Sequence, residues 1–167
     1  FFENEENAQF FLKRKIISNA QAKVLPGAGI NLDEYPYVPM QDDGVCSFLF
    51  VGRIMKEKGV DEFFAAAKTL KAEFGERVSF DVVGFYEDAY KETVEKLVDE
   101  GIVNFHGFQS NVHPFYEKTD YVVLPSYHEG MSNVLLEGAA TGRALITSDI
   151  PGCREAVEEG VSGYLCK

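Results

Sequence analysis

Short apolar runs alternate with longer amphipathic segments through most of the chain. Runs rich in Val, Phe, Leu and Ile predict buried strands at 47–51, 78–83, 102–105, 121–124, 144–147 and 163–165. Apolar residues at helical spacing predict helices over 60–74, 90–98, 112–118 and 133–141, a short helix around Glu155, and stops at Gly75, Gly101 and Gly142. This alternation predicts an α/β fold with a Rossmann-like, doubly wound parallel sheet of about six strands and helices on both faces.

The first 45 residues follow a different pattern. Apolar positions over 8–17 predict a helix, and a Pro- and acid-rich stretch then runs to Gly44. We therefore expect a lead-in and linker over 1–45 and one domain over 46–167. Because the chain begins without Met at Phe1 and stops abruptly at Cys166 and Lys167, we expect it to be a piece of a longer protein.

Composition limits the kinds of ligand that this chain binds. With 167 residues, of which 46% are apolar, it is long enough to form a core. The net charge of −11 argues against a nucleic-acid groove and against broad docking to an anionic membrane. A phosphate ligand therefore needs a local site.

Cysteine and histidine usage argues against metal and disulfide frameworks. Three scattered cysteines without CxxC spacing suit a reducing, cytoplasmic compartment. His106, His113 and His128 fall on separate predicted loops without metal-ligand spacing, so no metal is expected. No apolar run is long enough to insert into a membrane.

Two glutamates eight positions apart, Glu129 and Glu137, carry the strongest chemical signal. Glu129 follows a predicted strand, Ser132 is a candidate helix N-cap, and Glu137 lies about one turn into the helix. The free N–H groups expected between them offer a seat for a phosphate, and the carboxylates suit sugar hydroxyls. The alternative is a surface carboxylate at 129 and a solvated helix residue at 137. Glu137, however, adjoins Gly138, Ala139 and Ala140, where a carboxylate needs a hydrogen-bond donor.

The turn after the first predicted strand adds positive charge to the same edge. Arg53 directly follows Gly52, and Lys58 stands at the end of the turn. A guanidinium fork and a compact ammonium both suit diphosphate oxygens, although a solvated loop is the alternative, and Lys56 fits a surface lysine. Because parallel strands place their carboxyl ends at one edge, these residues and Glu129 are predicted to share one cleft.

Several stretches between Phe48 and Leu165 match one known family in unbroken order. They are 50–53 with 58–59, 82–84, 105–108, 124–126, 129–130, 136–139, and Gly152 with Glu155. This part of the chain resembles the C-terminal half of the family-4 retaining glycosyltransferases, which have the two-domain GT-B fold. It resembles most the bacterial enzymes that build capsule, O-antigen or related glycans on lipid carriers.

The resemblance implies a role for each site residue. Arg53 and Lys58 would hold the donor diphosphate, Glu129 would contact the transferred sugar near its reacting carbon, and Glu137 would hold the ribose hydroxyls. Further donors to sugar and phosphate would be Gly130, Met131, Ser132 and Asn133, and Phe85 and Phe108 would border the base. No metal or cofactor is implied, because the basic side chains and a helix N-terminus would neutralise the diphosphate.

The resemblance also implies partners. The parent enzyme would transfer a sugar from a nucleotide-sugar to a glycan or lipid-linked acceptor with retention, in the cytoplasm or peripherally at the inner face of the membrane. UDP is the expected carrier from family frequency alone. The acceptor half is absent, so we expect this chain to bind donor without transferring sugar. Two alternatives stay open: a sugar-nucleotide epimerase-type domain, and an interaction module without a ligand.

Overall fold

A six-stranded parallel sheet forms the centre of the computed structural model, which describes residues 1–25 and 27–167. Its order is β3-β2-β1-β4-β5-β6. The strands are β1 Cys46–Val51, β2 Val78–Val83, β3 Asn104–Phe105, β4 Tyr121–Leu124, β5 Ala144–Ser148 and β6 Gly163–Cys166. The predicted α/β fold with a parallel sheet is confirmed.

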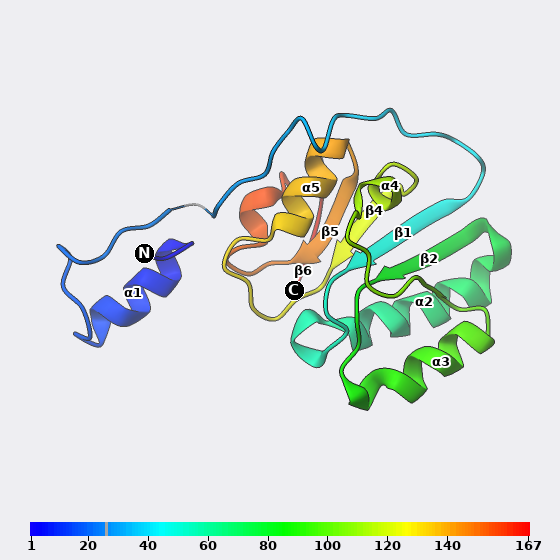
Figure 1. Cartoon of the computed structure of the whole chain (residues 1–167), viewed down its shortest axis with the longest axis horizontal. Helices are drawn as coiled ribbons and strands as arrows, with labels where there is room; N and C mark the ends of the chain where they lie inside the picture. Colours follow the sequence, from blue (N-terminus) through cyan, green and yellow to red (C-terminus); the bar gives the residue numbers. More distant parts are fainter. Residues whose placement is uncertain (26) are drawn as a thin grey trace.

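The strand order reverses between β1 and β4. From β1 the chain moves outward to β2 and β3, then returns to β4 and moves the other way. Right-handed crossovers therefore place helices on opposite sides of the sheet, with α2 and α3 on one side and α4 and α5 on the other (Figure 1). The helices are α2 Val60–Phe74, α3 Lys91–Asp99, α4 His113–Tyr116 and α5 Asn133–Thr141. The reversal is where open α/β sheets bind ligands.

Single 3-10 turns complete the connections: η1 Lys56–Lys58, η2 Gly75–Arg77, η3 Asp88–Tyr90 and η4 Arg154–Ala156. The helix expected around Glu155 is thus one 3-10 turn. The strand expected over 102–105 is shorter than predicted, because the N–H groups of Ile102 and Val103 donate to the carbonyl of Leu97 and belong to the end of the preceding helix.

Aromatic packing anchors β1 to α2 and β2. Phe50 and Phe63 have ring centroids 5.5 Å apart, and Phe48 stacks on Phe80 at 4.9 Å. Phe50, Phe63 and Phe80 are buried, and each such side chain contributes about 1.5–3 kcal/mol by leaving water. This packing holds β1 and β2 against α2.

The lead-in contains one helix, α1 Glu5–Lys13, rather than the expected helix over 8–17. It begins earlier because the side chain of Asn4 caps it, accepting from the N–H of Asn7 at 2.8 Å. It ends earlier because Lys15 has a φ of 56°. Phe2 and Val24 form a parallel bridge, so the lead-in is folded on itself; Pro26 of the expected linker lies outside the described residues.

The linker lies along α4 and α5 before it reaches β1 (Figure 1). The N–H of Val38 donates to the carbonyl of Thr141 at 3.1 Å. Buried Arg143 donates to the carbonyls of Val38 and Thr119. The linker is therefore docked on the domain. No helix within residues 1–25 and 27–167 combines the length and the hydrophobicity that a membrane span requires.

Candidate functional site

The loops that follow β1, β2 and β3 are joined by backbone hydrogen bonds. The N–H of Gly52 donates to Val83, and that of Gly84 to Gly107, both at 2.9 Å. A Cβ at Gly84 would collide with the carbonyl oxygen of Gly52, so only glycine allows this approach. The strand ends therefore meet at one edge of the sheet, as the sequence predicts.

Two further loops lock together across the strand reversal. The N–H of Tyr127, after β4, donates to the carbonyl of Glu57 in η1 at 2.9 Å. The hydroxyl of Ser126 donates to the same carbonyl at 3.0 Å. Gly59 ends η1 at a φ of 68°, and a Cβ there would collide with the carbonyl of Pro125. The positions of Lys58 and Glu129 are thus fixed relative to one another.

Lys58 and Glu129 form an ion pair at this junction. Lys58 Nζ lies 2.6 Å from Glu129 Oε1, and the side chains are 23% and 12% exposed. A charged hydrogen bond this well shielded from water is stronger than a surface pair. The structure therefore brings together two of the predicted site residues.

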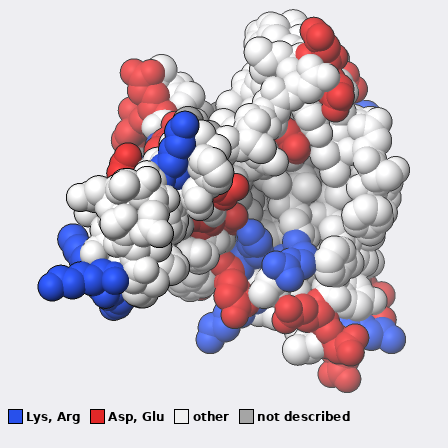
Figure 2. Space-filling model, turned by 60° about the vertical axis from the view of Figure 1, so that its left-hand side comes forward, with Lys and Arg blue, Asp and Glu red and all other residues white. Residues whose placement is uncertain are grey.

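Acidic and basic side chains lie next to one another on the face shown in Figure 2, around the hollow in that face, with no continuous basic surface. This arrangement agrees with the net charge of −11. An anionic ligand therefore depends on individual side chains and N–H groups rather than on a broad field.

Glu137 is held by a tyrosine instead of a cation. The hydroxyl of Tyr116 donates to Glu137 Oε2 at 2.9 Å. Burial raises the pKa of Glu137, and hydrogen bonds from Tyr116 and Tyr35 oppose that rise. The expectation that this carboxylate needs a donor is confirmed, while its contact with ribose stays a prediction.

The predicted row of free N–H groups between the two glutamates is only partly present. Ser132 is the N-cap of α5, and its hydroxyl accepts from Leu135 N–H at 3.4 Å. Its own N–H donates to Gly152 at 2.9 Å, and Met131 N–H donates to Glu3 Oε2 at 3.2 Å. The prediction is wrong for the Ser132 amide, because the loop after β5 packs against it. The candidate anion seat is the first turn of α5, beginning at Asn133, where N–H groups lack intrahelical acceptors.

The lead-in contributes contacts that sequence reasoning missed. Asn4 Nδ2 donates to the carbonyl of Gly130 at 3.1 Å, beside the Glu3 contact to Met131. These residues are more than 120 positions apart in the chain, and no local pattern signals such a contact.

The remaining predicted residues lie exposed at the same edge. Arg53 follows Gly52 at the end of β1 and is exposed. Phe85 and Phe108, on the loops after β2 and β3, are 52% and 70% exposed. Their side chains are accessible to a ligand, and their predicted contacts to diphosphate and base stay predictions.

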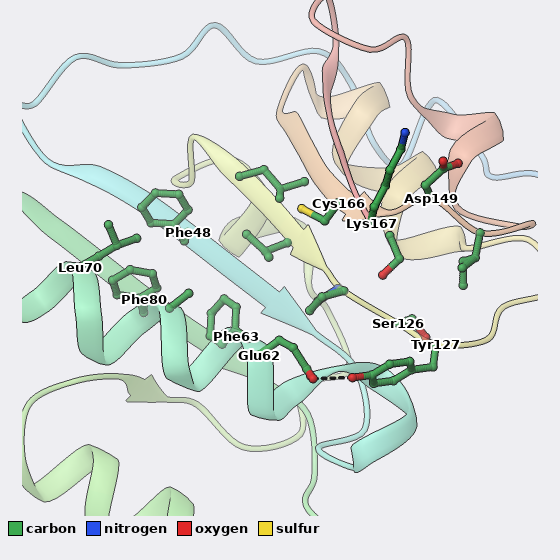
Figure 3. Close-up of a pocket in the computed structure, with 16 residues that line it drawn as sticks. Phe48, Glu62, Phe63, Leu70, Phe80, Ser126, Tyr127, Asp149, Cys166 and Lys167 are labelled. Carbon is green, nitrogen blue, oxygen red and sulfur yellow. Dashed lines mark hydrogen bonds between the residues drawn. The ribbon is translucent and has the colours of Figure 1, made fainter.

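A separate apolar pocket lies beside α2 (Figure 3). Phe48, Phe63 and Leu70 line it, and Tyr127 at its edge donates a hydrogen bond to Glu62. Its lining offers few polar groups to a diphosphate, so we place the candidate site at the loops instead. In the described part of the chain, no group of three or more His, Cys, Asp or Glu side chains could hold a metal.

The family model described as glycosyl transferases group 1 matches residues 46–167. The chain belongs to the group 1 glycosyltransferases. A similar relative of this family is the N,N'-diacetylbacillosaminyl-diphospho-undecaprenol alpha-1,3-N-acetylgalactosaminyltransferase of Campylobacter jejuni, 29% identical over 178 residues, covering 99% of this chain and 46% of the relative. The glycogen synthase of Mycobacterium tuberculosis is 31% identical over 83% of this chain and 34% of its own length.

Solved glycosyltransferases share the fold. The crystal structure of Anabaena HepE with UDP and glucose superposes with a TM-score of 0.77 at 20% identity, covering 99% of this chain and 48% of that one. The fold is thus that of the GT-B glycosyltransferases. This group 1 chain spans about a third to a half of the length of these relatives.

Proposed function

We propose that this chain is the donor-binding domain of a retaining glycosyltransferase that uses a nucleotide-sugar, with UDP as the carrier. The observation that carries the proposal is the Lys58–Glu129 pair, 2.6 Å apart at the strand reversal and beside the first turn of α5. Cation, carboxylate and helix N-terminus together suit a ligand with both phosphate charge and sugar hydroxyls.

Donor binding would exchange the partners of this pair. Diphosphate oxygens would take Lys58 and the exposed Arg53, since both side chains form strong charge-assisted hydrogen bonds. Glu129, released from Lys58, would accept hydrogen bonds from the transferred sugar. N–H groups and side chains over 130–133 would complete the sugar and phosphate contacts.

The nucleoside would occupy the other side of the site. Glu137 would accept from the ribose hydroxyls, and the exposed rings of Phe85 and Phe108 would border the base. HepE, solved with UDP and glucose, supports UDP as the first nucleotide to test.

In the whole enzyme we propose displacement on the front face of the sugar. The bond between the anomeric carbon and the diphosphate breaks, and its electron pair leaves on the phosphate oxygen, stabilised by Arg53 and Lys58. The acceptor oxygen bonds the same carbon from the same side, and its proton passes to the departing phosphate. The undecaprenol in the name of the Campylobacter relative supports a lipid-linked acceptor. We further propose that the whole enzyme works in the cytoplasm or at the inner face of the membrane.

An NMR titration of the isotopically labelled chain with UDP, ADP and GDP tests this function. We expect one nucleotide to shift the signals of Arg53, Lys58 and residues 129–133. Lys58→Ala should weaken that binding roughly 10-fold or more, because a charged hydrogen bond is lost. Lys56→Ala, which removes an exposed lysine two positions away, should leave it unchanged.

Two outcomes would count against the proposal. No shift with any of the nucleotides at millimolar concentration would favour an interaction module. Equal losses for Lys56→Ala and Lys58→Ala would mean that the contact is general charge attraction.

A further inference from the structure

Two tyrosines from distant parts of the chain pack together beside Glu137. Tyr116, the last residue of α4, is fully buried, and its hydroxyl lies 2.9 Å from Glu137 Oε2. Tyr35 belongs to the linker, and its ring meets that of Tyr116 edge to face with centroids 6.1 Å apart. His113, also in α4, packs edge to face on Tyr35 as well, with ring centroids 5.7 Å apart. The linker and α4 thus converge on one carboxylate.

A buried tyrosine hydroxyl needs an acceptor, but it does not need a charged one. A backbone carbonyl would satisfy Tyr116 without the cost of desolvating a carboxylate. That cost is visible in this structure, because burial raises the pKa of Glu137. Glu137 in turn adds to the effect of burial in raising the pKa of Tyr35 to about 12. The arrangement is costlier than packing alone requires.

The tyrosines also limit how Glu137 can move. A free glutamate on a helix surface samples several rotamers, whereas the Tyr116 hydroxyl at 2.9 Å restrains this one. The edge-to-face contact of the Tyr35 ring in turn holds the ring of Tyr116. A carboxylate offers about four acceptor positions, and the Tyr116 hydroxyl uses one of them. The positions that remain are enough for two adjacent hydroxyls on a ligand.

We propose that Tyr116 and Tyr35 are positioning residues that hold Glu137 in the orientation needed to accept from both ribose hydroxyls. This inference rests on the proposed function, in which Glu137 binds ribose. It gives the linker a part in nucleotide recognition, because Tyr35 lies outside the domain matched by the family model.

The test compares nucleotides with and without the ribose diol. Binding of UDP, ADP and GDP, and of their 2′,3′-dideoxy forms, is measured by calorimetry on the whole chain. The ratio of the two affinities reports on the diol alone. We expect Glu137→Ala to bring this ratio to one, because the two forms then bind equally. Tyr116→Phe should reduce the ratio about 3- to 10-fold, and Tyr35→Phe should reduce it by less.

Tyr90→Phe is the matched control, because the Tyr90 hydroxyl donates to Asp61 Oδ2 at 3.1 Å and therefore also forms a tyrosine–carboxylate pair. It should leave both affinities unchanged. If Tyr116→Phe fails to fold, Tyr35→Phe keeps the inference open to refutation, because Tyr35 is only partly buried.

The outcomes separate the two levels of the argument. If Glu137→Ala abolishes the diol ratio while both tyrosine variants keep it, ribose binding stands and the positioning role is overturned. If the tyrosine variants weaken diol and dideoxy nucleotides equally, the role is structural, and the inference again fails. If Glu137→Ala keeps the full ratio, or no nucleotide binds the wild-type chain, the proposed function fails and the inference fails with it.

Discussion

The carboxylate before α5 and the carboxylate within it are held in opposite ways. Glu129 faces the ammonium of Lys58 at 2.6 Å, whereas Glu137 faces the neutral hydroxyl of Tyr116 at 2.9 Å. An ion pair can exchange its partner when another anion arrives, because the attraction is between charges of any source. A hydroxyl donor gains little from an incoming phosphate when it already has a carboxylate. The Lys58–Glu129 pair, which we call the Lys58 end of the site, can therefore exchange partners when a ligand binds. Glu137, which we call the pre-shaped end, already has its orientation before the ligand arrives.

The largest effect should come from separating the loops that hold the Lys58 end. Gly59→Ala forces a side chain into the left-handed region and into the carbonyl of Pro125. We expect it to lower the free energy of unfolding by more than about 3 kcal/mol, and to weaken diphosphate binding. Gly101→Ala is the control, because Gly101 has the same φ of 68° with open space around it. It should cost only about 1–2 kcal/mol. Denaturant unfolding measures the free energy of unfolding of both variants. An equal loss in the two would contradict the conclusion that the loops lock together at Gly59.

The next effect concerns the exposed guanidinium at the end of β1. Arg53→Ala should weaken binding of a nucleoside diphosphate by roughly 1.5–3 kcal/mol, because charged hydrogen bonds to phosphate are lost. The same variant should leave the weak binding of the unphosphorylated nucleoside unchanged. Calorimetry with both ligands measures this difference. A loss of nucleoside binding as well would place Arg53 at the other end of the site.

The ion pair itself should contribute a smaller energy. A double-mutant cycle with Lys58→Ala and Glu129→Ala should give a coupling of about 0.5–2 kcal/mol in the free energy of unfolding, since the pair is shielded but reaches solvent. Raising the salt concentration should reduce that coupling. A coupling of zero would mean that the contact is not a stable pair.

The smallest effect is a pH dependence at the pre-shaped end. Burial raises the pKa of Glu137, so the folded chain binds this proton more tightly than the unfolded chain. The contribution of protonated Glu137 to the free energy of unfolding is therefore complete at low pH, and it is lost as the pH rises through the pKa of Glu137 in the folded chain. Glu137→Gln should then melt at a higher temperature than the wild type at pH 7.5, and the gap should close as the pH falls below the ordinary value for glutamate. Thermal melts across pH check this, and a gap that widens in acid would contradict it.

Much of the domain could be predicted because local signals agree with its tertiary structure. Apolar periodicity and terminal glycines predict α2, β2, β4 and α5 with the bounds that the structure shows. The sequence likewise predicts that Lys58 and Glu129 share one cleft, because both follow strands whose carboxyl ends meet at the same edge of a parallel sheet.

The missed features depend on contacts between distant segments. The early start of α1 follows from the Asn4 cap, and the same residue contacts Gly130. Tyr116 meets Glu137 only once α4 packs on α5, and Tyr35 reaches Tyr116 only once the linker docks there. No spacing in the sequence reports such packing, since each segment alone fits an ordinary loop or helix.

A structure of this chain with bound UDP tests the central claim most directly. The account predicts Lys58 Nζ on a phosphate oxygen instead of Glu129, and Glu137 still bonded to Tyr116 while it accepts from the ribose. A nucleotide in the apolar pocket beside α2, or one bound at the loops with the Lys58–Glu129 pair intact, would contradict it.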